Sequence, residues 1–192
     1  MRLGLLANEI TVLGPGKRLV IWFAGCFRHC ENCSTPELRE SFEEQEIDII
    51  KEVEQQNLSN IKCVTISGGE PFAQSKDLLA IVKHFRANGA EDILVYTGYT
   101  FAELKNMKSK TVDEIIKDID VLIDGTYIRE LDVGQRLQGS SNQVMHIFNS
   151  KLKARYNEYV SKGRKVQVFF TGKGMHIAGL MPKEALPQRK VI

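Results

Sequence analysis

Apolar and polar positions between residues 1 and 125 alternate between short apolar runs and longer amphipathic stretches. Strands are predicted where apolar and β-branched residues follow one another, at Leu19–Phe23, Ile61–Ser67, Ile93–Tyr96 and Val121–Ile123. A further short strand is predicted at Glu9–Leu13, because the turn sequence Gly14-Pro15-Gly16 follows it.

The stretches between these strands carry apolar residues at helical spacing. Helices are predicted at Ser41–Gln56 and Ser75–Ala87, and two shorter ones at Phe101–Met107 and Thr111–Ile119. In the first helix the acidic residues Glu43–Glu46 fall in the first turn, where they suit the helix dipole. Strand, loop and helix alternate, which favours an α/β fold with a parallel sheet and right-handed crossovers.

The pattern changes after residue 150. A short helix is predicted around Tyr156 and Val160. Two β-rich runs, Val166–Phe170 and Met175–Gly179, flank a turn that contains glycine, which predicts an antiparallel hairpin. These runs are too apolar to stay free in water, so we expect the hairpin either to extend the sheet or to present a surface to a partner.

Composition narrows the class of protein. The chain has 192 residues, 43% of them hydrophobic and 26% charged, as is ordinary for one soluble domain. A net charge of +2 is too small to indicate a nucleic acid or an acidic membrane as partner. The apolar run Leu3–Ala7 is too short for a signal peptide, and reduced thiols in a chain without such a signal predict the cytoplasm.

Three of the four cysteines lie in one loop directly after the predicted strand Leu19–Phe23. Cys26, Cys30 and Cys33 form a CxxxCxxC pattern, and an odd trio suits a metal centre better than disulfides. Iron–sulfur clusters are normally held by four thiolates, and structural zinc sites by four Cys or His ligands. Three ligands in one loop therefore favour a cluster with one iron open to a ligand that is not protein.

A structural zinc site is the alternative reading of the same loop. Its fourth ligand would be His29 or Cys63. His29 directly precedes Cys30, which makes it awkward for both to face one metal. Cys63 lies in a β-rich run, where a free cysteine is usually a small buried hydrophobe.

A second motif, Ser67-Gly68-Gly69-Glu70-Pro71, ends the predicted strand Ile61–Ser67. Paired glycines let a ligand approach the backbone closely. Glu70 adds an acceptor that suits a positively charged amine.

With these two motifs the chain resembles the radical S-adenosylmethionine (AdoMet) enzymes, and among them the activating proteins of anaerobic (class III) ribonucleotide reductases. The motifs that carry the resemblance occur in that family's order and cover residues 1–148: Gly14–Gly16, Gly25-Cys26 with its CxxxCxxC, Ser67–Pro71, Tyr96–Tyr99 with Glu103-Leu104, Val121–Gly125 and Gly139–Gln143. The resemblance implies an incomplete, TIM-like α/β barrel. We therefore divide the chain into a radical AdoMet core, residues 1–148, and a C-terminal β-hairpin extension, residues 149–192, packed on the core.

The resemblance also implies the roles of the site residues. Cys26, Cys30 and Cys33 would each bind an iron of one 4Fe–4S cluster, with AdoMet on the fourth iron. The remaining cofactor contacts would come from three short segments: Asn32, Cys33 and Ser34 beside the adenine, Gly68, Gly69 and Glu70 at the methionyl amino group, and Thr97, Gly98 and Tyr99 along the cleft. Asn32 and Ser34 depart from the family, which often has an aromatic residue at these places.

The activity implied is reductive cleavage of AdoMet to a 5′-deoxyadenosyl radical, which then takes a hydrogen atom from a glycine of a large partner enzyme. The implied partner is anaerobic ribonucleotide reductase, and the implied electron donor is a flavodoxin or ferredoxin. Two alternatives stay open: a radical AdoMet enzyme that modifies a peptide or small molecule, and a non-catalytic iron–sulfur or zinc protein. Asp124 and Ser140–Gln143 either act in the site or fix turns.

Overall fold

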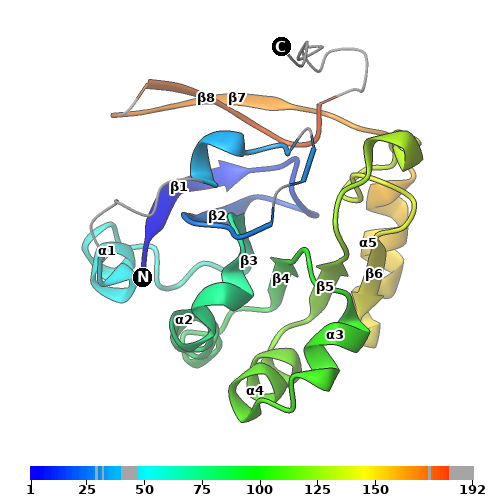
Figure 1. The fold of residues 1–192 in the computed structure, drawn as a ribbon. Helices are drawn as coiled ribbons and strands as arrows, with labels where there is room; N and C mark the ends of the chain where they lie inside the picture. Colours follow the sequence, from blue (N-terminus) through cyan, green and yellow to red (C-terminus); the bar gives the residue numbers. More distant parts are fainter. Residues whose placement is uncertain (29, 32, 40–46, 173, 182–192) are drawn as a thin grey trace.

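The computed structural model describes residues 1–28, 30–31, 33–39, 47–172 and 174–181, and every structural statement below refers to these residues. Six strands form one sheet in the order β1-β2-β3-β4-β5-β6, and two more form a separate hairpin (Figure 1). The strands are β1 (Leu3–Ile10), β2 (Arg18–Phe23), β3 (Cys63–Gly68), β4 (Asp92–Tyr96), β5 (Val121–Asp124), β6 (Val144–Ile147), β7 (Gln167–Thr171) and β8 (Gly174–Ala178). The α-helices are α1 (Ile49–Gln55), α2 (Ser75–Ala87), α3 (Phe101–Asn106), α4 (Lys110–Asp118) and α5 (Lys153–Val160). Short 3₁₀ turns lie at Pro36–Leu38, Pro71–Gln74, Arg129–Leu131 and Ser150–Leu152.

The four central strands are parallel, and the two edge strands are antiparallel to their neighbours. Helices α1 to α4 cover one face of the sheet, where apolar side chains of the helices and of β2 to β5 form the largest core cluster. The opposite face is covered by α5 and the β7–β8 hairpin (Figure 1). The predicted α/β class with a parallel centre is confirmed. No described helix is long and apolar enough to cross a lipid bilayer.

Most predicted elements are confirmed within a few residues, and three predictions were wrong. The first strand is Leu3–Ile10, and Thr11–Leu13 lie outside it, because β1 pairs with β2 from Leu3 opposite Phe23 to Ile10 opposite Arg18. The edge strand β6 was missed.

The third wrong prediction is the start of the first helix. Ile47 exchanges backbone hydrogen bonds with Met1, and Asp48 caps α1 by accepting from the backbone N–H groups of Ile50 and Lys51. Helix α1 therefore begins at Ile49, and Ser41, where the predicted helix begins, lies outside the described residues. The acidic residues Glu43–Glu46 lie outside the described part of the chain.

The β7–β8 hairpin does not extend the six-stranded sheet in the part of the chain that is described. It packs on β2 through side chains, with the ring of Phe169 stacked on Trp22 at a centroid distance of 6.0 Å. Ala178 is buried in the same cluster. The other face of the hairpin is exposed and carries Val168 and Phe170, which pair with Ile177 and Met175 across the two strands.

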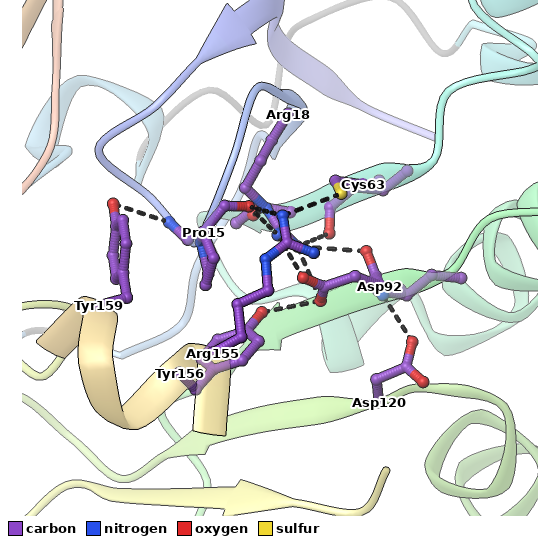
Figure 2. A network of polar contacts seen from close by, with 12 residues as sticks. Pro15, Arg18, Cys63, Asp92, Asp120, Arg155, Tyr156 and Tyr159 are labelled. Carbon is purple, nitrogen blue, oxygen red and sulfur yellow. Dashed lines mark hydrogen bonds and ion pairs between the residues drawn. The ribbon is translucent and has the colours of Figure 1, made fainter. Parts of the chain in front are cut away.

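A buried ion pair joins the starts of the central strands (Figure 2). Arg18 of β2 binds the carboxylate of Asp92 of β4 at 2.7 Å and 3.1 Å, and both side chains are fully buried. Thr65 and the carbonyl oxygens of Pro15 and Val64 accept the other guanidinium protons. Tyr156 of α5 donates to Asp92 at 2.8 Å, so the helix after residue 150 completes this network. Because both side chains are hydrogen-bonded throughout, these bonds offset the free-energy cost of removing the two charges from water.

Candidate functional site

The cysteine loop begins where β2 ends and lies against the motif that ends β3. The backbone N–H groups of Gly69 and Glu70 donate to the carbonyl oxygens of Phe23 and Gly25, at 2.7 Å and 3.0 Å. A Cβ on Gly68 would lie 2.3 Å from the Phe23 oxygen, and one on Gly69 would lie 2.2 Å from the Gly25 oxygen. The groups that approach these glycines here are the backbone of β2 and of the cysteine loop, and their contact with the cofactor stays a prediction.

The three thiols of the loop are partly exposed. Burial raises the pKa of Cys26, and the negative charges of Glu70 and the other two thiolates raise it further. Burial and the charge of Cys33 raise the pKa of Cys30, while the nearby Arg28 cation lowers it. The backbone N–H of Arg28 lies 3.4 Å from the Cys26 sulfur and donates to it.

This donor set fits an iron–sulfur cluster. Neighbouring thiolates raise the pKa of Cys26 and of Cys30, so their ionised forms are unfavourable alone, and bound metal holds coordinating thiols in the deprotonated form. N–H···S hydrogen bonds are a common feature of cluster sites. Among the described residues, no three His, Cys, Asp or Glu side chains are gathered around a single metal-ion position.

Cys63 lies far from the loop. It is the first residue of β3 and is buried, with its sulfur 3.9 Å from Arg155 at the end of the sheet drawn in Figure 2. The loop follows the opposite ends of these parallel strands, roughly 17 Å away at about 3.3 Å per residue along β3. Cys63 is therefore no ligand candidate, and its predicted place as a small buried residue is confirmed. His29 lies outside the described residues.

Glu70, which follows β3, is hydrogen-bonded to the residues that follow β4. Its side chain is 1% exposed and accepts hydrogen bonds from Thr97 Oγ1 at 2.9 Å, Gly98 N at 2.8 Å and Phe72 N at 3.0 Å. Burial raises the pKa of Glu70, and these hydrogen bonds partly oppose the rise. Thr97 also accepts from Tyr99 N at 3.1 Å. The structure thus brings together four of the residues proposed from sequence to contact the cofactor.

Arg28, which the sequence patterns did not single out, joins the cysteine loop to this group. Its guanidinium lies 4.4 Å from the ring centroid of Tyr99, donates to Thr126 Oγ1 at 2.8 Å, and places Nε 4.0 Å from Glu70. A Cβ on Gly98 would lie 2.5 Å from Arg28 Cδ. A positive residue inside a thiolate loop is the one sequence signal that could have identified it.

A pocket opens on another side of the loop. Its lining includes Cys30, Cys33 and Ser34, together with Ser67 of β3 and the segment 177–181. Thr35 connects the two sides, because it lines the pocket and donates to the Gly68 oxygen at 3.2 Å. Glu70 and the residues around it are not part of this lining. Asn32, proposed to lie beside the adenine, falls outside the described residues.

Asp124 and the Ser140–Gln143 loop have structural partners. Asp124 accepts from the backbone N–H groups of Phe101 at 2.6 Å and Val144 at 3.0 Å, and lies 3.0 Å from His146 Nε2. Gln143 accepts from Gly139 N and donates to the Gly125 oxygen, both at 2.7 Å. These contacts fix α3, β6 and the turn after β5.

Comparison with known proteins agrees with this site. Residues 12–146 match the family described as a 4Fe-4S single cluster domain. The anaerobic ribonucleoside-triphosphate reductase-activating protein of Vibrio cholerae is 33% identical over 148 residues, which are 72% of this chain and 92% of that protein. The protein of the same name from Escherichia coli K12 is 32% identical over 150 residues, 70% of this chain and 91% of its own length.

A more distant relative, the pyruvate formate-lyase-activating enzyme of Staphylococcus epidermidis, is 27% identical over 150 residues, which are 74% of this chain and 59% of that enzyme. The family match, residues 12–146, contains the cysteine loop, the Glu70 group and the strands from β2 to β5, and it ends within β6. The chain belongs to the 4Fe-4S single cluster domain family and, within it, to the anaerobic ribonucleoside-triphosphate reductase-activating proteins.

Proposed function

We propose that this protein is a radical AdoMet enzyme that generates a glycyl radical on the large subunit of anaerobic ribonucleotide reductase. The observation that carries the proposal is the contact between the CxxxCxxC loop and the buried Glu70 group, within a region that matches reductase-activating proteins over most of their length. A bound cluster and AdoMet would together supply a 5′-deoxyadenosyl radical, with the electron coming from a flavodoxin or ferredoxin.

The residues of the loop bind the cluster. Cys26, Cys30 and Cys33 would each hold one iron of the cluster, and AdoMet would bind at the iron that has no protein thiolate. Arg28 places positive charge beside Cys30, which stabilises the ionised form of that thiol. Short backbone contacts through Gly68 and Gly69 hold the loop at a fixed distance from the end of β3.

The Glu70 group binds the methionyl amine. Glu70 is buried and anionic at neutral pH only at a cost, which an ammonium group beside it would reduce. Thr97 and Gly98 orient its carboxylate, and Tyr99 forms the adjoining wall. Asn32, Cys33 and Ser34 remain our proposal for the adenine side of the cofactor.

The wider assignments follow from the same proposal. The six-stranded sheet has helices on one face and α5 with the hairpin on the other, and this arrangement supports our proposal of a partial barrel with its site at the carboxyl ends of the strands. Residues 1–148 form the catalytic core, and 149–192 an extension packed on it. The protein works in the cytoplasm, with no nucleic acid or membrane as partner.

Anaerobic assay with the reductase tests this function. Reconstituted protein, AdoMet and a reductant should produce 5′-deoxyadenosine together with a glycyl radical on the purified anaerobic ribonucleotide reductase of the same organism, detected by electron paramagnetic resonance. AdoMet cleavage without a radical on the reductase would favour another peptide or small-molecule substrate. No cleavage at all would indicate a non-catalytic metal protein.

A further inference from the structure

The pocket beside the cysteine loop is built partly from residues outside the matched family region, which ends at residue 146. Cys30, Cys33 and Ser34 of the loop line the pocket. Arg164 and residues 177–181 of the C-terminal extension line it as well, and we call residues 177–181 the pocket wall. Since the proposed function gives the three loop residues to the cluster and the cofactor, the pocket wall borders the cofactor site.

A series of contacts joins the pocket wall to a cysteine of the loop. Burial raises the pKa of Cys30, and a backbone hydrogen bond from Tyr127 opposes that rise. The Tyr127 hydroxyl donates to Asp132 Oδ2 at 3.2 Å. Asp132 forms an ion pair with Arg164, whose Nη2 lies 2.7 Å from Oδ1, and Arg164 donates to the Met181 oxygen at 3.2 Å. The position of the pocket wall is therefore linked to the position of Cys30.

The ion pair between Asp132 and Arg164 fixes the pocket wall. The two side chains are 2% and 6% exposed, and Arg164 also donates to the Gly139 oxygen at 2.8 Å. A buried ion pair with such additional hydrogen bonds is strongly destabilised when one partner is lost. Gly179 has φ +102°, and a Cβ there would lie 2.5 Å from the Lys165 oxygen, so the chain turns tightly into the wall.

The charges of the pocket indicate what it can accept. Apart from the thiols, Asp132 and Arg164 are the charged side chains of its described lining, and they neutralise each other. The lining also offers aromatic, apolar and neutral hydrogen-bonding groups, among them Trp22, Tyr127, Leu137, Leu180, Ser34 and Gln143. A charged group would lose its hydration here without gaining a partner. An uncharged planar ring with polar edges, such as that of a nucleoside, suits this lining.

The carboxylate proposed for the charged end of AdoMet lies elsewhere, because Glu70 is not part of the lining. Thr35 lies between the two places. It lines the pocket, donates to the Gly68 oxygen at 3.2 Å, and has its hydroxyl 4.0 Å from the Cys33 sulfur. A ligand with a charged amino-acid end and a neutral nucleoside end matches this division.

We propose that this pocket receives the adenosine part of AdoMet, and that the C-terminal extension supplies its wall through residues 177–181, with Arg164 as the positioning residue. The inference rests on the proposed function, since it takes AdoMet to be the cofactor. AdoMet recognition in this chain then depends on residues outside the matched family region.

The test fills the pocket from the wall in the reconstituted full chain. Leu180→Trp places a larger side chain on the lining, and Val168→Trp, on the exposed face of the β7–β8 hairpin, is the matched control. Leu180→Trp should weaken AdoMet binding, followed by the spectrum of the reduced cluster, by about ten-fold or more, because overpacking is costly. Binding of methionine, which lacks the adenosine part, and the iron content should stay as in the wild type. Val168→Trp should change none of these.

Photolabelling locates the adenine without relying on a variant. Irradiation of the wild-type chain with 8-azido-AdoMet should label a residue of the pocket wall, as located by mass spectrometry. A label confined to the matched family region would overturn the proposal, and so would wild-type AdoMet affinity in Leu180→Trp. An equal loss of methionine affinity in Leu180→Trp would also overturn it, because the wall would then act on the cluster. If Leu180→Trp loses its iron, the site of the label decides.

Failure of the proposed function gives a different result. A wild-type chain that is labelled in the pocket wall but makes no glycyl radical on the reductase would contradict the proposed function and support this inference. Intact AdoMet binding in Leu180→Trp with loss of the glycyl radical would assign the pocket to the acceptor and overturn the inference.

Discussion

Arg28 passes over Gly98 so closely that a methyl group on Gly98 would lie 2.5 Å from Cδ and 2.9 Å from Nε of the arginine. Because Gly98 has no side chain, the Arg28 guanidinium can lie over the ring of Tyr99 and donate a hydrogen bond to Thr126. The loop that carries the three cysteines is therefore tied by one side chain to the segments that follow β4 and β5.

Gly98→Ala should displace Arg28 and destabilise the apoprotein by about 1–3 kcal/mol, the usual cost of overpacking. In an Arg28→Ala background the obstacle is gone, so the same change should cost much less. Urea unfolding of the two single variants and the double variant gives their coupling energy, expected at about 0.5–3 kcal/mol for residues in contact. If the losses in unfolding free energy of the two single variants simply added in the double variant, Gly98 would not be needed to make room for Arg28.

Asp92→Asn should destabilise the protein by about 3–5 kcal/mol, because Arg18 would keep a buried charge without its partner. Tyr156→Phe should cost less, about 1.5–3 kcal/mol, since it removes one hydrogen bond to a charged group. Urea unfolding measures both. Lys162→Ala, which breaks an exposed pair with Glu158 on the same helix, is the control and should leave the unfolding midpoint unchanged. If Tyr156→Phe were as stable as the wild type, the hydrogen bond from α5 to Asp92 would not contribute to the stability of the fold.

Glu70 should make the apoprotein less stable as the pH rises. Burial raises the folded pKa of Glu70 above its ordinary 4.5, so the folded state binds more protons than the unfolded state between these two values. The contribution of Glu70 to stability therefore falls from pH 4.5 up through the raised pKa. The stability of Glu70→Gln relative to wild type should increase across that window.

Glu103 provides the opposite control for this pH dependence. Hydrogen bonds from Thr100 hold the pKa of Glu103 below 4.5, so its contribution is present above that pH and is lost as the pH falls through the folded value. Urea unfolding at a series of pH values should give opposite trends for Glu70→Gln and Glu103→Gln. Parallel curves for wild type and Glu70→Gln would contradict the burial argument.

Sequence patterns predicted the central strands and α2 well, because strands buried on both faces and amphipathic helices leave strong periodic signals. The family resemblance implied that the cysteine loop, Glu70 and Thr97 contact one cofactor, and the parallel strands that precede them end at one edge of the sheet. The edge strand β6 was missed because its four residues are half-buried or exposed and give no clear alternation.

Other features depend on contacts between distant residues, which local patterns do not contain. Arg18 and Asp92 are 74 positions apart, and neither lies in a motif. The close contacts of Gly68 and Gly69 are with the backbone of β2 and of the cysteine loop, which lie outside their own motif. The sequence motifs end before residue 148, yet Arg164 and residues 177–181 line the pocket beside the cysteine loop.

The most direct test of the account is the metal content and spectrum of the anaerobically reconstituted protein. We predict about four irons and four sulfides per chain, following the thiolate rules for such clusters, and a spectrum of the reduced cluster that changes when AdoMet is added. Cys26→Ala, Cys30→Ala and Cys33→Ala should each lose the cluster, whereas Cys63→Ala should keep it. Stoichiometric zinc in a colourless protein, or loss of the cluster in Cys63→Ala, would contradict a three-cysteine cluster with an open iron.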